Sequence, residues 1–297
     1  MFVLRRLLCQ LLATMTVVAS ENPGPSLIAL QDSDSNSLIR ISLEGRVVKT
    51  IAEGVPGIAL IYDHNGDFIV LSKQSITRVL KAGVKSVIVE SQPGANWCAI
   101  AAAQGGDFIV ADCKTNILSK VSPSGEVGEF ARYPNGSWPV ESLGLVETQD
   151  GFLLFRQGDD EALQLYRVNN KGDVRVLALS GMSRGPGRGS WHLQDSAHAL
   201  NGGPLCSDGH GGYYFADTPY TRAVYHMTAA GAVTRLLSLR EFGSGTYPLV
   251  FEPKSRTLFS MGSFRLISIL PTDPGNVPHA TAKQIQVPRP TALLLER

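Results

Sequence analysis

The sequence predicts an all-β protein, a six-bladed β-propeller with four antiparallel strands in each blade. Three observations predict it: a composition rich in turn formers, a short apolar motif that recurs six times, and complementary gaps at the two ends of the repeat. Of 297 residues, 30 are glycine and 17 are proline, while 43% are hydrophobic and 18% are charged. This background is too apolar for a disordered chain and too rich in turn formers for a helical bundle.

The first three repeats lie within the N-terminal part of the chain. Each pairs one apolar run with a second run that follows a short turn, the pattern of adjacent β-strands. They are Ile28-Ala29-Leu30 with Leu38-Ile39-Arg40-Ile41, Phe68-Ile69-Val70 with Ile76-Thr77-Arg78-Val79, and Phe108-Ile109-Val110-Ala111-Asp112 with Leu118-Ser119-Lys120-Val121.

Three further repeats continue the pattern to the end of the chain. They are Phe152-Leu153-Leu154-Phe155 with Leu165-Tyr166-Arg167-Val168, Tyr213-Tyr214-Phe215-Ala216-Asp217 with Ala223-Val224-Tyr225-His226, and Leu258-Phe259-Ser260 with Leu266-Ile267-Ser268-Ile269. Most repeats have another short apolar strand before them and one after them. Four strands per roughly 40–60 residues are typical of a propeller blade.

The two ends of the repeat complement each other. The first repeat lacks a leading strand, whereas the chain ends in an extra apolar segment, Thr291-Ala292-Leu293-Leu294-Leu295. We therefore expect the C-terminal strand to pair with the N-terminal blade and close the ring, because closure removes two open sheet edges.

The N-terminus carries the features of a secretory signal. Arg5 and Arg6 precede an apolar run over residues 7–19, and Val18-Ala19-Ser20 offers small residues for cleavage. The run is shorter than the roughly 20 apolar residues of a membrane span. We expect residues 1–20 to be a signal peptide, and residues 21–297 to be a single secreted or periplasmic domain, monomeric and without a membrane span.

The net charge bears on the class of partner, and the cysteine spacing bears on a possible disulfide. The 27 Lys+Arg and 26 Asp+Glu residues leave a net charge of +1, which disfavours nucleic acid as a partner.

If Gly105 and Gly106 form a two-residue hairpin turn, Cys98 and Cys113 lie opposite each other. An oxidising compartment would then allow a disulfide, and the alternative is two buried thiols.

All three tryptophans fall on segments that enter an inner strand. In a propeller these segments share one rim of the central channel, where function usually resides. The entering segments are residues 53–57, 92–97, 133–142, 181–201 and 242–247, and they contain Trp97, Trp138, Trp191 and Tyr247. Rigid aromatic rings at a channel mouth suit a small molecule, a glycan or a peptide. The alternative is that each tryptophan fills the gap between neighbouring blades.

Residues 181–201 form the longest interruption of the repeat. A segment of this length suggests a lid over the channel. Its candidate functional residues are Arg184 for ligand binding and His192, His198 and Asp195 for acid–base chemistry, with Glu141 on the same rim. No nucleophile elbow, paired-histidine zinc motif or phosphate loop is present, which disfavours serine hydrolases, zinc proteases and nucleotide chemistry.

The fifth repeat resembles an NHL repeat. The resemblance rests on Leu200-Asn201-Gly202-Gly203-Pro204, Asp208-Gly209, Tyr213-Tyr214-Phe215-Ala216-Asp217-Thr218 and Arg222. The wider superfamily of six-bladed propellers includes the SMP-30/gluconolactonase group, streptogramin lyases and non-catalytic binding propellers. In the gluconolactonase group a divalent metal lies in the channel, held by one Glu, two Asn and one Asp.

The resemblance implies three candidate metal ligands in this chain, Asn201, Asn96 and Glu53, for Ca²⁺ or Zn²⁺. The aspartate expected near Tyr247 has no counterpart. We therefore expect an exported propeller that binds a small molecule, a glycan or a peptide at a tryptophan-rimmed channel. The alternatives are a lactonase-like hydrolase, a lyase, or a biosynthetic-pathway cyclase on the same fold.

Overall fold

The main sheets of this computed structural model are each built from four strands joined largely by short turns. The structure describes residues 26–31, 36–42, 46–133, 144–148, 150–157, 163–176, 182–184, 191–193, 205–217, 223–238, 249–252, 257–262, 265–270, 281–286 and 290–295. Within these residues the strands form six four-stranded antiparallel sheets and one two-stranded sheet. We number the four-stranded sheets as blades one to six in chain order.

The strands of blades one to three are given from the centre of the ring outward. Blade one is β26 (Pro290–Leu295), β1 (Ser26–Gln31), β2 (Ser37–Ser42) and β3 (Val47–Ala52); blade two is β4 (Ala59–Tyr62), β5 (Phe68–Leu71), β6 (Ser75–Val79) and β7 (Lys85–Glu90); blade three is β8 (Trp97–Ala102), β9 (Phe108–Asp112), β10 (Ile117–Val121) and β11 (Val127–Arg132).

The remaining strands follow in the same order. Blade four is β12 (Gly144–Thr148), β13 (Gly151–Gln157), β14 (Leu163–Asn169) and β15 (Val174–Val176); blade five is β18 (Leu205–Ser207), β19 (Tyr213–Asp217), β20 (Ala223–Met227) and β21 (Val233–Ser238); blade six is β22 (Leu249–Glu252), β23 (Thr257–Gly262), β24 (Arg265–Leu270) and β25 (Thr281–Gln286); β16 (Met182–Arg184) and β17 (Trp191–Leu193) form the two-stranded sheet.

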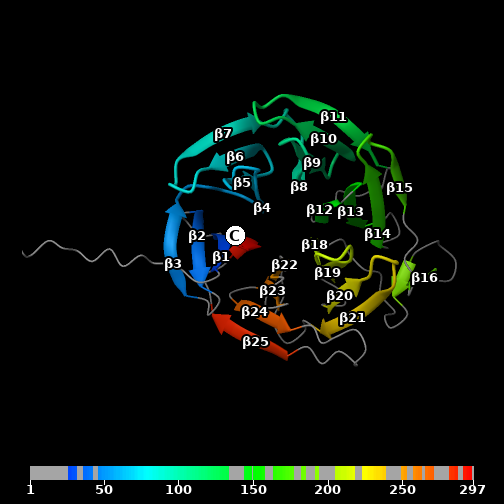
Figure 1. The fold of residues 1–297 in the computed structure, drawn as a ribbon. Coiled ribbons are helices and arrows are strands. Elements are labelled where there is room, and N and C mark those ends of the chain that lie inside the picture. The colour runs from blue at the N-terminus through cyan, green and yellow to red at the C-terminus, as the bar shows by residue number, and fades with distance from the viewer. Residues whose placement is uncertain are drawn as a thin grey trace, which may run out of the picture.

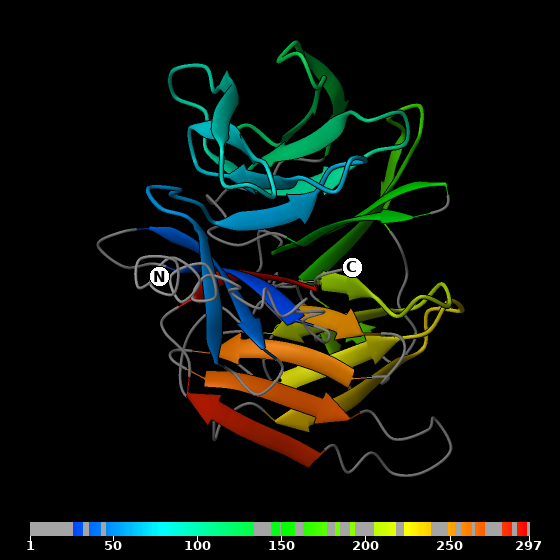
Figure 2. The same ribbon diagram turned by 60° about the vertical axis from the view of Figure 1, so that its left-hand side comes forward.

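The inner strands close a ring. They contact one another in the cyclic order β26, β4, β8, β12, β18, β22 and back to β26, around the centre seen in Figure 1. The closing strand β26 pairs antiparallel with β1, with Leu27 opposite Leu295 and Ala29 opposite Leu293. Figure 2 shows the red C-terminal strand beside the blue N-terminal strand. The expectations of an all-β propeller with four-stranded blades, and of closure by the C-terminal strand, are confirmed.

Burial explains the continuous apolar runs. The second strands β1, β5 and β9 are buried almost throughout, because a neighbouring blade covers each face. The outer strands β3, β7 and β11 are largely exposed and carry polar side chains between the apolar ones. The core is therefore a series of layers between blades, such as the layer in which Val70 of blade two packs with Leu30 and Leu38 of blade one.

Three outer hairpins contact the preceding blade through a glycine. Gly83, Gly125 and Gly172 all have positive φ angles, of 87°, 92° and 87°. A Cβ atom on any of them would meet a backbone carbonyl oxygen of the preceding outer strand at 2.2–2.4 Å, as Gly172 would meet that of Phe130. The blades therefore approach each other so closely at these turns that only glycine fits.

The β8–β9 hairpin differs from the sequence-based expectation. Its loop contains three residues, Gln104, Gly105 and Gly106, because the Ala103 amide donates to the Asp107 carbonyl (2.9 Å). The expected two-residue turn is therefore wrong by one position. A register shift between Trp97 and Ala99 makes Cys98 a bulge residue. This extra residue compensates for the longer loop, so Cys98 still lies near Cys113.

Substituting Gly172 with alanine tests the contact between blades. We expect Gly172→Ala to lower the free energy of unfolding by about 1–3 kcal/mol, because alanine is strained at this φ and its methyl group meets the Phe130 carbonyl. Urea unfolding followed by circular dichroism measures the change. Gly128→Ala is the matched control, since nothing lies within 4 Å of its Cβ position. Equal effects of both substitutions would contradict the assigned contact.

Candidate functional site

The entry end of the ring, where the chain enters each inner strand, is tied together by backbone hydrogen bonds between blades. At three described junctions, an amide of the loop or strand that enters a blade donates to a carbonyl in the preceding blade. The bonds run from Val55 to Asn36 (2.7 Å), from Trp97 to Lys73 (3.3 Å) and from Tyr133 to Asn116 (3.1 Å). Each entry segment is therefore positioned by the blade before it.

Asparagines in the same unusual conformation provide two of these three acceptors. Asn36 and Asn116 are the non-glycine residues with positive φ in the described part of the chain, with φ of 43° and 58°. Each precedes the third strand of its blade, and asparagine tolerates this left-handed region better than most residues. The conformation lets each carbonyl accept the amide of the following entry segment.

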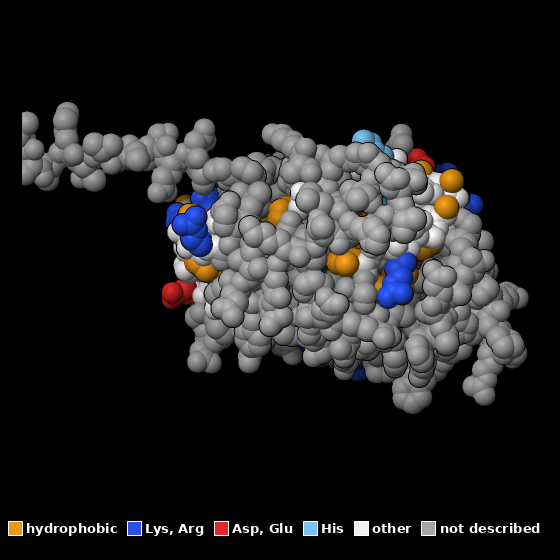
Figure 3. All heavy atoms as spheres, turned by 90° about the horizontal axis from the view of Figure 1, so that it is seen from below, with side chains coloured by type: hydrophobic (Ala, Val, Ile, Leu, Met, Phe, Trp, Pro, Cys, Tyr) orange, Lys and Arg blue, Asp and Glu red, His pale blue; other side chains and the backbone are white. Residues whose placement is uncertain are grey.

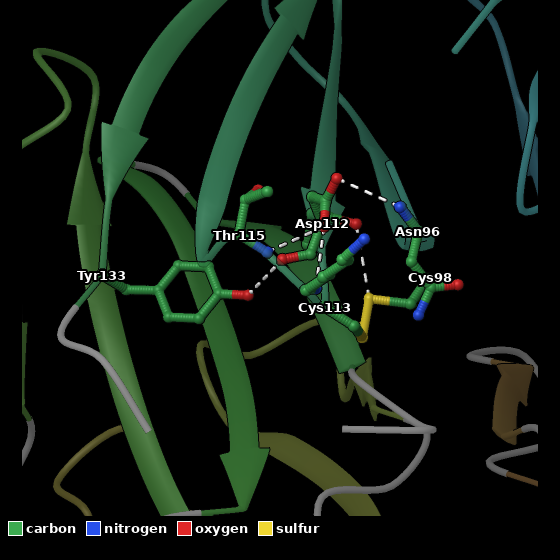
Figure 4. Close-up of a disulfide and its surroundings, with 8 residues drawn as sticks. Asn96, Cys98, Asp112, Cys113, Thr115 and Tyr133 are labelled. Atoms are coloured by element: carbon green, nitrogen blue, oxygen red, sulfur yellow. Dashed lines mark hydrogen bonds between the residues drawn. A yellow bond between two sulfur atoms is a disulfide. The ribbon is translucent and has the colours of Figure 1, made fainter. Parts of the chain in front are cut away.

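A disulfide and a buried carboxylate hold the entry to β8 (Figure 4). Cys98 and Cys113 are bonded, with their Cα atoms 5.9 Å apart, so the disulfide proposed from sequence is confirmed. The Cys113 amide also donates to the Asn96 carbonyl (3.0 Å). The bond joins the first strand of blade three to the end of its second strand.

Asp112 organises the loop beside this disulfide. Its Oδ1 accepts the amides of Lys114 (2.8 Å) and Thr115 (3.0 Å), and its Oδ2 accepts the Asn96 amide (3.2 Å). The Tyr133 hydroxyl donates to the Asp112 carbonyl oxygen (2.9 Å). Asp112 is only 5% exposed, so its charge is satisfied by protein donors and serves to position the rim.

Trp97 does not line the channel mouth. It is 4% exposed and packs in a buried layer with Ile69 and Leu71 of blade two and Phe108 of blade three. Its expected role as a ligand-binding residue is therefore corrected: its indole fills the gap between two blades. The reason is that its amide is tied to Lys73, which draws the start of β8 toward blade two.

The hairpin that carries Arg184, Trp191 and His192 is not found at the channel. Its strands pair with Arg184 opposite Trp191 and Ser183 opposite His192. β17 contacts β14, and Figure 1 draws β16 outside the ring. The expectation that these three residues lie over the channel is therefore corrected. The physical reason is that β16 begins only six positions after the outermost strand β15, before the chain returns to the centre.

The other candidate residues divide between described and undescribed parts. Asn96 lies on the entry loop of blade three and is half-buried, and Glu53 lies on that of blade two and is exposed. Trp138, Glu141, Asp195, His198, Asn201 and Tyr247 lie outside the described residues.

The described residues do not fit a divalent metal at the entry end. Lys85 Nζ donates to the carbonyl oxygens of Glu53 (2.6 Å) and Gly54 (3.3 Å), which places a positive charge beside one candidate ligand. No group of three or more metal-ligating His, Cys, Asp or Glu side chains occurs among the residues that the structure describes. No chemical step through a metal is therefore derived.

The exit end, where each inner strand leaves the channel, carries titratable side chains. Figure 3 shows His, acidic and basic side chains together at one rim of the ring. His64 Nε2 donates to the Ala103 carbonyl (2.9 Å), and the Gln104 amide donates to the Glu147 carboxylate. That carbonyl and that amide belong to one peptide group, so a single peptide unit of blade three links an imidazole of blade two to a carboxylate of blade four.

The pKa of the Glu147 carboxyl group is shifted from its ordinary value. Burial raises the pKa of its carboxyl group, and the nearby His64 and the Gln104 hydrogen bond only partly offset this, so the pKa stays above its ordinary value of 4.5. Sequence reasoning missed this pair, because the two residues are far apart in the chain. The signal that could have found them is the repeat itself, which places the end of every inner strand at one rim.

Comparisons with known proteins support the fold. No family model matches the chain, and no curated protein matches it by sequence. A chain of the nidogen/laminin complex is similar with a TM-score of 0.66 at 15% identity, covering 92% of this chain and 99% of that one. A streptogramin B lyase scores 0.54 at 15% identity, covering 90% and 84%.

A gluconolactonase from Xanthomonas campestris is also similar, with a TM-score of 0.53 at 14% identity, covering 80% of this chain and 86% of that one. At such identities these likenesses establish the propeller fold and leave the activity open. No helix in the described part of the chain is long and apolar enough to cross a membrane.

Removing the disulfide tests its contribution to the rim. We expect the double variant Cys98→Ser, Cys113→Ser to lose about 3 kcal/mol of unfolding free energy, because the bond closes a loop of 15 residues in the unfolded chain. Urea unfolding without reductant measures the loss. Cys206→Ser, which changes a cysteine of blade five outside this disulfide, is the control. A double variant as stable as the wild type would contradict this role.

The pKa of Glu147 predicts a pH dependence of stability. Because folding raises this pKa, the native state binds the proton more tightly than the unfolded state. The stabilisation from this group is present at low pH and is lost as the pH rises through the native pKa, above 4.5. We expect Glu147→Gln to remove this decline in urea unfolding measured from about pH 4 to about pH 7. The exposed Glu90→Gln should retain it, and an unchanged decline in Glu147→Gln would refute the assignment.

Proposed function

We propose that this chain is an exported, six-bladed propeller that binds a small molecule, a glycan or a peptide at the entry end of its channel. The observation that carries the proposal is the anchoring of successive entry segments to the preceding blade. A rim fixed before binding loses less conformational entropy when a ligand arrives, so its polar groups can be used for recognition. Export is supported by the Cys98–Cys113 disulfide, which persists in oxidising compartments.

Asn96 is the described residue best placed to contact such a ligand. Its backbone amide and carbonyl are already engaged by Asp112 and Cys113, which fixes its position, and its side chain is half-buried at the start of β8. Gln92, Pro93 and Gly94 are exposed beside it on the same loop. An amide side chain offers both a donor and acceptors, which suits glycans and peptides alike.

A ligand panel tests the proposal. We expect a thermal-shift screen of glycans, peptides and small molecules to identify a ligand, and Asn96→Ala to weaken its Kd at least tenfold, equivalent to about 1.4 kcal/mol. Asn65→Ala, an exposed asparagine of the exit end, is the matched control. A ligand that binds both variants equally would place recognition elsewhere, and no ligand across the panel would count against a binding role.

The second candidate is an enzyme: a lactonase-like hydrolase, a lyase or a biosynthetic-pathway cyclase. One observation favours it: one peptide group links the half-buried Glu147, whose pKa burial raises, to His64, and carboxyl and imidazole groups are the usual general acids and bases of enzymes. Turnover of lactones or a ring-opening elimination, abolished by Glu141→Gln or His198→Ala, would support chemistry at the entry rim. Loss of turnover in Glu147→Gln alone would place the chemistry at the exit end.

A further inference from the structure

A cation recurs at one position of the third strand. The residues Arg78, Lys120, Arg167 and His226 lie opposite Ile69, Ile109, Leu153 and Tyr214. These in turn lie opposite Ile61, Ala101, Val146 and Cys206 on the inner strands. These four basic side chains therefore occupy one register position of blades two to five, and the histidine among them is charged only when it is protonated.

In three of these blades the cation has a carboxylate partner at the exit end. Arg78 Nε lies 3.3 Å from Asp63 Oδ2, Lys120 Nζ lies 2.7 Å from Asp107 Oδ2, and His226 Nε2 lies 2.9 Å from Asp208 Oδ2. Each partner belongs to the turn between the inner and second strands of the same blade. The pair thus closes the exit end of the blade.

In the His226–Asp208 pair of blade five, hydrogen bonds stabilise the carboxylate form of Asp208. Burial raises the pKa of Asp208, but the hydrogen bonds from His226 and from the His210 and Gly212 amides outweigh it, so the pKa lies below its ordinary value. Asp208 therefore carries its negative charge wherever the protein is folded near neutral pH. The repeated arrangement is an acidic side chain of the turn paired with a basic side chain of the third strand.

Blade four keeps the cation and lacks the acid. By register, the position of Asp63 and Asp208, two residues beyond Ile61 and Cys206, is occupied by Thr148. Gly151 lies opposite Thr148, at the other side of a shortened turn. Within the described residues, Arg167 Nε and Thr148 Oγ1 are both buried without a hydrogen-bond partner.

Other carboxylates near Arg167 are engaged elsewhere. Glu147 accepts the Gln104 amide toward blade three, and Asp173 accepts the Asn169 side-chain amide (2.8 Å). Asp150, in the turn, is exposed. Buried donors without partners are rare in proteins, so the unpaired Arg167 Nε and the unpaired Thr148 hydroxyl of the same blade each call for an acceptor.

Two neighbours make this position favourable for negative charge. Arg175 lies directly opposite Arg167 on β15, so two guanidinium groups share one face of the sheet. Tyr213 of blade five lies close enough for Arg167 to act on its ionisation: burial raises the pKa of the Tyr213 hydroxyl, Arg167 opposes that rise and Asp208 adds to it. The exit end of blade four, next to Tyr213 of blade five, therefore combines positive charge with hydroxyl donors.

We propose that the exit end of blade four binds an oxyanion, the carboxylate or phosphate group of a small molecule, with Arg167 and Thr148 as its donors. A guanidinium group matches the geometry of both anions, and the bound oxygen takes the place that the turn aspartate occupies in blades two and five. This site lies at the opposite end of the ring from the entry rim. It is independent of the proposed function and can fail without it.

Small anions at matched ionic strength test the site. We expect phosphate or acetate to raise the melting temperature of the wild-type protein above that in sodium chloride, since a ligand that binds the native state stabilises it. Arg167→Gln should lower the affinity for the anion at least tenfold. Thr148→Asp should abolish the anion effect and leave the anion-free melting temperature equal or higher, because the new carboxylate pairs with Arg167 as Asp63 pairs with Arg78.

The control variant is tested by the same measurement, the melting temperature with and without the anion. Arg235→Gln removes an exposed arginine from the outer strand of blade five and should keep the full anion effect. A phosphate-only response identifies a phosphate-bearing ligand, and an acetate response a carboxylate. No response beyond chloride, or an equal loss in Arg235→Gln, overturns the proposal and leaves water as the partner of Arg167.

Discussion

The backbone pairing between β1 and β26 is the constraint on which the other contacts depend. It joins residues 26–31 to residues 290–295, so the first and last described strands of the chain complete one blade. Without it, β1 and β26 would each present unpaired backbone groups at an open edge. With it, the six inner strands form a continuous cycle, and both ends of the channel become rims built from successive blades.

The two rims are held by different physical means. At the entry end, backbone amides bond to carbonyls of the preceding blade, and Asp112 and the disulfide reinforce the loop before β8. Most of these bonds join backbone groups, and the Asp112 carboxylate adds three more to the loop before and after the second strand of blade three. At the exit end, side-chain ion pairs close single blades, and the link from His64 through the Ala103–Gln104 peptide to Glu147 joins blades two, three and four. The entry end therefore suits the binding site that we propose, and the exit end suits the proposed binding of an anion.

Local pattern predicted some side-chain contacts and misplaced others. The spacing of Cys98 and Cys113 led to the correct disulfide through an incorrect turn, because a bulge at Cys98 compensated for the longer loop. The position of Trp97 before an inner strand was compatible with either the rim or the core, since an indole is amphipathic. Its burial depends on the hydrogen bond to Lys73 in another blade, a contact that no local pattern encodes.

The amino-acid sequence by itself determined the strands, their grouping in fours and the closing role of the C-terminal segment, because apolar runs and turn residues act over a few positions. Tertiary structure alone decided which residues meet between blades. His64 and Glu147 share one peptide group of blade three, and blade four has Thr148 at the register position where blades two and five have an aspartate. The physical reason is that loop lengths and single-residue register shifts set these contacts between and within blades, and a shift of one residue turns a side chain to the opposite face.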